Sequence, residues 1–269
     1  MIKKKALILG ASSQIGQSLL KENNDLIELF QASRKDIDLM HLDLIQKFII
    51  GVNPDIVINC AAFTNVDGAE DNVSSVMTIN SASVEEIVKA CNKISATLIH
   101  FSSDYVFDGN AKTPYLETSE ANPLSVYGRS KLNADRLIET ECSNFLLFRI
   151  SWIYGIYNNN FLKAILNKIK IGEKLRVVDD QIGSPTTSRL VSQVILDIIS
   201  NFDLKGKKEL LNIQPKGSCS WFDFANFIND NLSNIKKLPT EDITPVSSGE
   251  FNAKALRPRY SVLDTNKIE

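Results

Sequence analysis

The sequence has few of the residues that form metal clusters and no stretch that could cross a membrane. Among its 269 residues are four cysteines and two histidines, with no Cys-x-x-Cys pair and no histidine at zinc-ligand spacing. This distribution excludes the common zinc sites, and we expect no bound metal and reduced cysteines. No apolar run approaches the roughly 18 residues of a membrane helix, and the apolar stretch at the amino terminus is too short for a signal peptide. We therefore expect a cytoplasmic protein without a membrane partner.

An excess of charge of either sign is also missing. Lysine and arginine together number 30 and aspartate and glutamate 32, so the net charge is −2 and the pI is about 5.8. Such a chain is not suited to binding the backbone of a nucleic acid, which attracts strongly basic surfaces. A small anionic ligand is not excluded, because it needs only a few local donors. With 43% hydrophobic residues, the chain can bury a large core.

Apolar strand patterns alternate with helical patterns over the first 150 residues. The expected strands are residues 5–9, 26–30, 56–59, 97–101 and 145–150, and the expected helices are residues 14–21, 43–52, 72–93 and 127–142. This alternation predicts an α/β fold with a doubly wound parallel sheet, as in Rossmann-like domains. The pattern loosens afterwards. We expect residues 1–150 to form a dinucleotide-binding domain and residues 151–269 mainly a small carboxyl-terminal substrate lobe, with segments that return to the first domain.

The first expected strand runs directly into a short loop with two glycines, residues 10–16, and then into a helix. A strand, a tight glycine turn and a helix N-terminus together form a binding site for a pyrophosphate. Gly10 would allow the turn, and Gly16 would let the helix pack closely on the strand. Two glycines alone are a weak signal, and the position after the first strand makes this one worth following.

The residues after the second expected strand, Ser33, Arg34 and Lys35, are polar or basic. In nucleotide-binding sheets this position meets the adenosine ribose, where an acidic residue favours NAD and an arginine accommodates the 2′-phosphate of NADP. We therefore expect NADPH as the cofactor, with NADH as the alternative.

Tyr127 and Lys131 are four residues apart on an expected helix and so share one face. A cation beside a phenol lowers the pKa of that phenol, which is otherwise near 10. Ser103 lies at the carboxyl end of the fourth expected strand, the sheet edge at which ligands bind. Together these groups could protonate a carbonyl oxygen while a hydride reaches its carbon. By itself Tyr-x-x-x-Lys is a weak pattern that more often marks an exposed helix face.

Six segments of the sequence, two of which contain Ser103, Tyr127 and Lys131, form a set of motifs whose order along the chain is itself a signal. They are residues 61–70 (AAFTNVDGAE), 102–109 (SSDYVFDG), 123–131 (PLSVYGRSK), 149–155 (RISWIYG), 180–186 (DQIGSPT) and 257–264 (RPRYSVLD). In these segments the chain resembles the extended short-chain dehydrogenases/reductases and, more narrowly, the dTDP-4-dehydrorhamnose reductase family, over residues 7–264. The resemblance implies NADPH-dependent reduction of the 4-keto group of a nucleotide-linked 4-keto-6-deoxyhexose. More narrowly it implies conversion of dTDP-4-dehydrorhamnose to dTDP-rhamnose, a precursor of cell-surface polysaccharide.

The resemblance also implies roles for individual residues. Tyr127 would donate the proton, and Lys131 would assist it and hold the nicotinamide ribose. Ser103 would bind the substrate carbonyl oxygen, and Asn80 would occupy the place of a proton-relay asparagine. The implied cofactor contacts, beside Ser33, Arg34, Tyr127 and Lys131, are Gly10, Ser13, Gln14, Ile15, Gly16, Asp43, Leu44, Ala61 and Ala62, of which Asp43 and Leu44 would contact the adenine. The implied substrate contacts are Thr64, Val66, Ser103, Asp104, Tyr105, Trp152, Gly183, Pro185, Thr186 and Arg257. We expect a nucleotide sugar as the partner and allow for a homodimer.

Three features depart from the family pattern. Ser13 replaces the usual middle glycine of the pyrophosphate loop, where its side chain would either crowd the cofactor or donate to a phosphate. Ser103 replaces the commoner threonine and keeps the hydroxyl. The sequence stops at Glu269, where relatives usually continue through a further helix, so we expect a changed edge of the substrate lobe.

Two other functions fit the same features. A nucleotide-sugar epimerase or dehydratase would hold NAD tightly and regenerate it, and Asp104 beside the catalytic hydroxyl is compatible with a dehydratase. A non-catalytic NADP-binding regulatory subunit would share the fold, although the presence of Tyr127, Lys131 and Ser103 together favours an enzyme.

Overall fold

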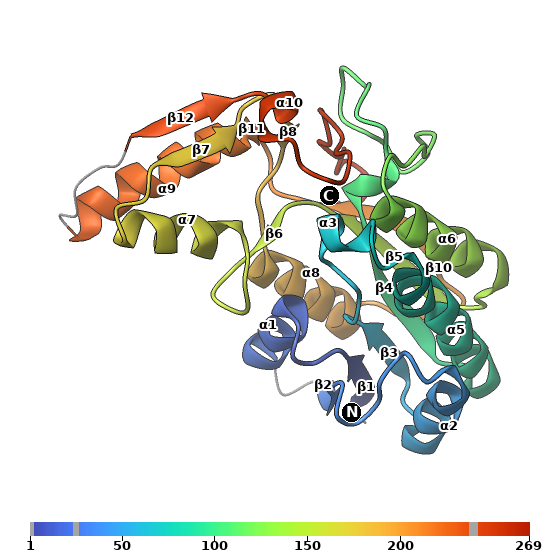
Figure 1. Cartoon of the computed structure of the whole chain (residues 1–269). Helices are drawn as coiled ribbons and strands as arrows, with labels where there is room; N and C mark the ends of the chain where they lie inside the picture. Colours follow the sequence, from blue (N-terminus) through green and yellow to red (C-terminus); the bar gives the residue numbers. More distant parts are fainter. Residues whose placement is uncertain (1–2, 24–26, 237–241) are drawn as a thin grey trace.

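A parallel six-stranded sheet forms the centre of the computed structural model, which describes residues 3–23, 27–236 and 242–269 (Figure 1). Across the sheet the strands lie in the order β10 (Lys208–Ile213), β5 (Phe145–Ile150), β4 (Thr97–Ser103), β3 (Ile56–Asn59), β1 (Lys4–Leu9) and β2 (Ile27–Ala32). The strand order reverses between β1 and β3, and ligands of such sheets bind at the carboxyl ends of the strands at this switch point. The predicted doubly wound sheet is confirmed.

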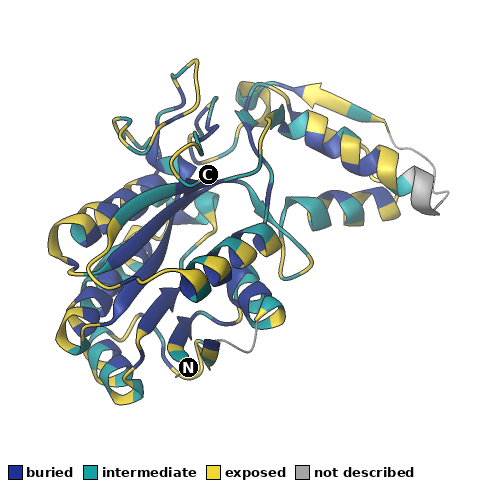
Figure 2. Ribbon diagram, turned by 180° about the vertical axis from the view of Figure 1, so that it is seen from behind, coloured by how far each residue is buried: buried dark blue, intermediate teal, exposed yellow. Residues whose placement is uncertain are grey.

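Helices cover both faces of the sheet because its strands are apolar on both sides. In β1, Leu7 and Leu9 face a core shared with α2 (Leu42–Val52), α5 (Ser83–Ile94) and α6 (Val126–Glu141). The alternate residues Ala6 and Ile8 face a second core shared with α1 (Gln14–Glu22) and α8 (Ser188–Asn201). Figure 2 shows the buried strands between helices whose outer faces are exposed.

The helix predicted over residues 72–93 is interrupted. The structure has α3 (Val66–Ala69) and α4 (Val73–Met77), then a π-helical turn, η1 (Thr78–Ala82), before α5 begins. Single π turns inside helices frequently mark functional positions. Here the turn contains Asn80, which is 1% exposed. α2 begins at Leu42, one residue before the expected start at residue 43, and its N-cap is His41.

A second group of elements lies beside the carboxyl edge of the sheet (Figure 1). The helices α7 (Phe161–Lys170) and α9 (Trp221–Lys236) pack against the parallel pair β7 (Leu175–Val178) and β12 (Ile243–Val246) around a separate apolar core. Two short pairings connect this group to the main sheet edge, β6 (Ile153–Tyr154) with β9 (Thr186–Thr187) and β8 (Ile182–Gly183) with β11 (Cys219–Ser220). The remaining elements are a 3-10 turn, η2 (Asp104–Val106), and α10 (Ser248–Phe251). The later part of the chain is thus shared between this group and the sheet, to which it contributes α8 and β10.

Candidate active site

A cavity of about 650 Å³ lies at the switch point, between the carboxyl ends of the strands and the second group of elements. Most of the predicted site residues line it: Gly10, Ser13, Gln14, Ile15, Arg34, Ala61, Ala62, Thr64, Val66, Ser103, Asp104, Tyr105, Tyr127, Lys131 and Trp152. The structure therefore brings together residues from six separate segments of the sequence. Gly16, Ser33, Asp43, Leu44, Asn80, Gly183, Pro185, Thr186 and Arg257 do not line this cavity.

The glycine turn has the geometry that a pyrophosphate site requires. Gly10 has a positive φ of +74°, and a Cβ at this position would come within 2.6 Å of the backbone nitrogen of Ala61. A Cβ at Gly16 would come within 2.6 Å of the carbonyl oxygen of Gly10, so Gly16 lets α1 pack against the turn. The N-terminus of α1 then carries unpaired N–H groups and a partial positive charge, which suit an anion. These residues fit the diphosphate of a dinucleotide.

Ser13 takes a role that neither expectation described. It is the N-cap of α1, and its Oγ accepts a hydrogen bond from the Gly16 N–H at 3.0 Å. The hydroxyl is therefore used by the helix, and it leaves one fewer N–H group available to a phosphate.

The predicted adenosine contacts need two corrections. Asp43 and Leu44 are exposed on α2 and lie outside the cavity, whose wall contains Asp38 and Leu39 instead. The sequence carries two Asp-Leu pairs five residues apart, and the prediction selected the second pair. Ser33 also lies outside the cavity, and its Oγ donates a hydrogen bond to Asp36 Oδ2 at 2.7 Å.

Arg34 lines the cavity, with its Nε 3.0 Å from Asp38 Oδ2. Its side chain is 75% exposed, so the guanidinium is free to meet a phosphate on the ribose. We predict that Arg34→Ala raises the KM for NADPH by about tenfold, a loss typical of one charge-assisted hydrogen bond, and changes the KM for NADH little. Initial rates with both cofactors check this, with Lys35→Ala as a neighbouring cation control. Equal losses with the two cofactors would contradict the assignment.

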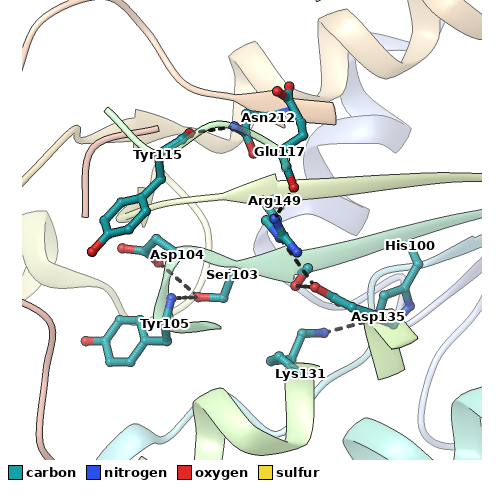
Figure 3. Close-up of polar contacts among 11 residues, drawn as sticks. His100, Ser103, Asp104, Tyr105, Tyr115, Glu117, Lys131, Asp135, Arg149 and Asn212 are labelled. Atoms are coloured by element: carbon teal, nitrogen blue, oxygen red, sulfur yellow. Dashed lines mark hydrogen bonds and ion pairs between the residues drawn. The ribbon is translucent and has the colours of Figure 1, made fainter. Parts of the chain in front are cut away.

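Tyr127 and Lys131 are placed by the first turn of α6. Ser125 caps this helix by accepting a hydrogen bond from the Gly128 N–H at 3.1 Å, and Gly128 lets α6 approach the carbonyl oxygen of Tyr105 closely. Tyr127 and Lys131 thereby face the same cavity as Ser103 (Figure 3 shows Ser103 and Lys131).

The electrostatics of this group differ from the sequence-based expectation. Burial raises the pKa of Tyr127 above its usual value, and a hydrogen bond with Ser103 acts in the opposite direction. Lys131 is 2% exposed, and burial lowers its pKa to about 8 while Asp135 raises it. The predicted lowering of the Tyr127 pKa by Lys131 is therefore not found in this arrangement; the lowering that is present comes from Ser103.

Asn80 is fully occupied by neighbours other than Lys131. Its Oδ1 accepts from the Phe63 N–H at 2.7 Å, and its Nδ2 donates to the Phe63 carbonyl at 3.1 Å and to Ser130 Oγ at 3.0 Å. The predicted relay asparagine therefore lies outside the cavity and fixes the loop after β3 against α6. The π turn that positions it gives no periodicity signal in the sequence.

Asp104 is buried beside the hydroxyl of Ser103. Ser103 Oγ donates to Asp104 Oδ1 at 2.9 Å (Figure 3), and burial raises the pKa of Asp104 to about 6. A carboxyl with this pKa can accept or donate a hydrogen bond near neutral pH. Tyr105 follows it and contacts the Tyr127 ring edge-on, with 5.5 Å between the centroids.

Arg257, which the resemblance implied as a substrate contact, makes an ion pair within the chain. Its Nη1 and Nη2 donate to Asp67 Oδ1 and Oδ2 at 3.0 and 2.6 Å, and it also forms a hydrogen bond with Tyr105. Arg257 thus holds its own segment of the chain against α3 and against Tyr105 in the cavity wall. The hydrogen bond from Arg257 lowers the pKa of Asp67.

We predict that Arg257→Ala raises the KM for the nucleotide sugar by about tenfold or more and lowers kcat less, because Tyr105 loses its support in the ground state. Steady-state kinetics with saturating cofactor measure this. Arg259→Ala, which removes an exposed arginine two residues away, is the matched control. A fall in kcat with unchanged KM would contradict a binding role.

Two tryptophans form the wall opposite the sheet edge. Trp152 and Trp221 stack with 3.4 Å between their centroids and 4° between their planes, and both line the cavity. A Cβ at Gly183 would collide with the Trp152 indole, so the glycine leaves room for that ring to pack against the backbone. Pro185 and Thr186 lie farther along the same segment, and Thr186 is fully buried, with its hydroxyl donating to the Ser184 carbonyl at 3.0 Å.

Several cavity residues were not anticipated from the sequence. They are Asp38, Leu39, Asn59, Cys60, Asn158, Asn159, Asn160 and Trp221. The asparagine run could have been noticed, because Asn160 caps α7 and its Nδ2 donates to Gln14 Oε1 at 2.9 Å, next to the glycine turn. Trp221 begins α9, far from the other site segments in the sequence, and only the fold brings it here.

The model of the RmlD substrate binding domain family matches residues 4–269. The chain belongs to this family. It is 34% identical to dTDP-4-dehydrorhamnose reductase of Aggregatibacter actinomycetemcomitans, over 98% of this chain and 91% of that protein. It is 33% identical to dTDP-4-dehydrorhamnose reductase of Escherichia coli K12, over 98% and 90%.

Solved structures of family members have the same fold. The dTDP-4-dehydrorhamnose reductase of Bacillus anthracis in complex with NADP superposes with a TM-score of 0.91 at 33% identity, covering 98% of this chain and 92% of that one. An orthologue from Clostridium acetobutylicum gives 0.89 at 34% identity, with 97% and 90% covered. The dTDP-glucose 4,6-dehydratase of Streptomyces venezuelae gives 0.79 at 14% identity over 98% and 89%, which shows a shared fold alone.

The part of the chain that the structure describes carries no cluster of metal ligands and no membrane-spanning helix. Within it, no group of three histidine, cysteine, aspartate or glutamate side chains could hold a metal ion. Among the same residues, no helix is long and apolar enough to span a membrane. All four cysteines are free.

Proposed function

We propose that the chain catalyses the NADPH-dependent reduction of dTDP-4-dehydrorhamnose to dTDP-rhamnose. The observation that carries this proposal is that a hydroxyl, a phenol and an amine, from Ser103, Tyr127 and Lys131, line the same cavity as the glycine turn at Gly10. The reductase relatives, at 33–34% identity over nearly the whole chain, support the choice of substrate. The NADP complex of the Bacillus anthracis relative supports the choice of cofactor.

In this proposal the chain supplies the protons and the orientation. NADPH, when bound, supplies the hydride, and the Gly10 turn with the N-terminus of α1 would hold its diphosphate. Arg34, Asp38 and Leu39 would hold the adenosine end, in place of Asp43 and Leu44. Ser103 rotates its hydroxyl hydrogen from Asp104 to the carbonyl oxygen of the substrate, and Tyr127 donates its proton as negative charge develops there.

The sugar and its diphosphate would occupy the side of the cavity formed by the second group of elements. Thr64, Val66, Asp104, Tyr105 and Trp152 line this side and are proposed to contact the sugar. Gly183, Pro185, Thr186 and Arg257 would support that wall from behind. A cytoplasmic location is part of the proposal, and the free cysteines support a reducing compartment. A homodimer stays a prediction.

The test is the loss of NADPH absorbance when the purified protein meets dTDP-4-dehydrorhamnose prepared enzymatically. We expect consumption of NADPH and formation of one equivalent of dTDP-rhamnose, identified by chromatography. Purified protein that carries bound NAD and shows no net oxidation of NADPH would favour an epimerase or a dehydratase. Tight NADPH binding without turnover of any nucleotide-linked keto sugar would favour a non-catalytic binding subunit.

A further inference from the structure

A histidine that the proposed mechanism does not use lies directly behind Lys131. His100 is on β4 and is 1% exposed. Its Nε2 is 3.2 Å from Lys131 Nζ, and its Nδ1 is 3.1 Å from Asn59 Nδ2 on the neighbouring strand β3 (Figure 3 shows His100 and Lys131). Both ring nitrogens therefore have partners, and the two partners together determine which nitrogen carries the hydrogen.

The orientation of the Asn59 amide is determined by the backbone. The Ala61 N–H donates to Asn59 Oδ1 at 3.2 Å, so the amide NH2 of Asn59 faces His100. That NH2 group can only donate, and His100 Nδ1 must accept. In a neutral imidazole the hydrogen is then on Nε2, which faces Lys131.

This tautomer distinguishes between the two charge states of Lys131. A neutral amine has a lone pair and can accept the Nε2–H of His100, whereas an ammonium has donors only. An ammonium would need a free lone pair on Nε2, with the hydrogen moved to Nδ1 and the Asn59 amide rotated. The rotated amide would direct its NH2 at the Ala61 N–H, donor against donor. The hydrogen bonds around His100 thus match Lys131 after it has lost a proton.

Burial, together with the charge of Lys131, keeps His100 neutral. Burial lowers the pKa of His100 well below its usual value, and Lys131 lowers it further. Asp135, one turn along α6, is the acidic neighbour that raises the pKa of Lys131. The titratable or charged groups from the elements around the pair are Tyr127 and Asp135 on α6, Arg149 on β5, Asp104 and Tyr105 on η2, and Cys60 after β3.

We propose that His100 is a positioning residue that stabilises the neutral amine of Lys131 after Lys131 has passed a proton to the Tyr127 phenolate. The inference rests on the proposed reductase function. Tyr127 gives its proton to the alkoxide oxygen, an N–H of Lys131 gives a proton to the phenolate, and a proton from water restores the ammonium. His100 donates its Nε2–H to Lys131 while the amine is neutral, and it exchanges no proton. Asn80 cannot supply this bond, because its amide is committed to Phe63 and Ser130.

The tautomer can be observed without turnover. The chain has two histidines, His41, which is exposed, and His100, so long-range ¹H–¹⁵N spectra of ¹⁵N-histidine-labelled protein give two ring patterns, assigned with His41→Gln. We expect the His100 pattern of a neutral ring protonated at Nε2 at a pH above the Lys131 pKa of about 8, where Lys131 is a neutral amine. A ring protonated at Nδ1, or an imidazolium, would overturn the proposal.

Kinetics and titration test the effect on Lys131. We expect His100→Phe to lower kcat by about tenfold and to move the alkaline limb of the pH profile up by about one unit, since the neutral amine loses a donor. Activity falls as pH rises through the pKa of Lys131, so a raised pKa moves that limb upward. ¹³C titration of labelled lysine should show the same direction, and His100→Gln, which keeps an N–H donor, should recover part of kcat. His41→Phe should change none of these.

The outcomes separate the two proposals. The role of His100 would be overturned if His100→Phe changed neither the alkaline limb of the pH–rate profile nor the titration of Lys131. This holds even if the wild type reduces the keto sugar. A wild type without reductase activity would overturn the proposed function, while the ring tautomer and the lysine titration would still report on the pair. If His100→Phe fails to fold, as judged by circular dichroism, His100→Gln and the wild-type spectra decide the question.

Discussion

Replacing Tyr127 with phenylalanine is expected to lower kcat for the keto sugar by about a hundred- to ten-thousandfold, the usual contribution of a positioned general acid. The change removes one oxygen from the cavity wall and keeps the ring that meets Tyr105 edge-on. NADPH binding, measured by calorimetry, should therefore remain close to that of the wild type. Stopped-flow absorbance under single-turnover conditions measures the chemical step directly.

Two comparisons make this result interpretable. Tyr157→Phe removes a phenol that does not line the cavity and should leave the rate unchanged. Ser103→Ala should also be slow, because Ser103 forms a hydrogen bond with Tyr127 and would bind the carbonyl oxygen. Turnover of Tyr127→Phe at the wild-type rate would remove Tyr127 from the mechanism.

Replacing Asp135 with alanine is expected to destabilise the fold by about 3–5 kcal/mol, because it leaves a buried arginine without its counter-charge. Arg149 Nε is 3.5 Å from Asp135 Oδ2, and the two side chains are 5% and 0% exposed (Figure 3). Asp135 also accepts from Ser102 Oγ at 2.8 Å, and Arg149 Nη1 donates to the Glu117 carbonyl at 2.9 Å. The pair therefore joins α6 to β4, β5 and the long loop after η2.

Denaturant or thermal unfolding measures this loss, which corresponds to a fall in Tm of about 10 °C for a chain of this size. Glu209→Ala is the control, because it breaks the Glu209–Lys267 ion pair, whose side chains are 42% and 46% exposed, and should cost less than about 1 kcal/mol. The double variant Asp135→Leu with Arg149→Met should recover much of the stability. An Asp135→Ala protein as stable as the wild type would show that the buried pair contributes nothing.

The sheet and most of the cavity could be predicted because their signals are local. Residues 145–150 form a continuous apolar run except for Arg149, and β5 has those bounds in the structure. Gly10 and Tyr127 lie beside predicted strand and helix ends, so the fold carries them to one edge. In the sequence, Arg149 interrupts the apolar pattern of the strand without indicating a partner. Asp135 lies on a helix, and the helical pattern does not show that it pairs with Arg149.

What could not be predicted depends on contacts between distant segments. Asp67 accepts hydrogen bonds from both terminal nitrogens of Arg257, although the two residues are 190 positions apart in the sequence. No short-range sequence pattern predicts such a contact. The π turn around Asn80 lacks a periodicity of its own within an amphipathic helix. The choice between Asp38-Leu39 and Asp43-Leu44 depends on where α2 begins, and helix boundaries are the least certain part of a sequence-based assignment.

The stacked indoles in the cavity have an optical consequence. Trp152 and Trp221 are the two tryptophans of the chain, and both lie in the cavity wall in direct contact. The tryptophan fluorescence of the protein therefore originates at one place in the cavity wall, where the sugar is proposed to bind. A compound that separates the two rings changes the emission wavelength and the intensity of the tryptophan fluorescence. Ligand binding can therefore be followed in real time without an added label.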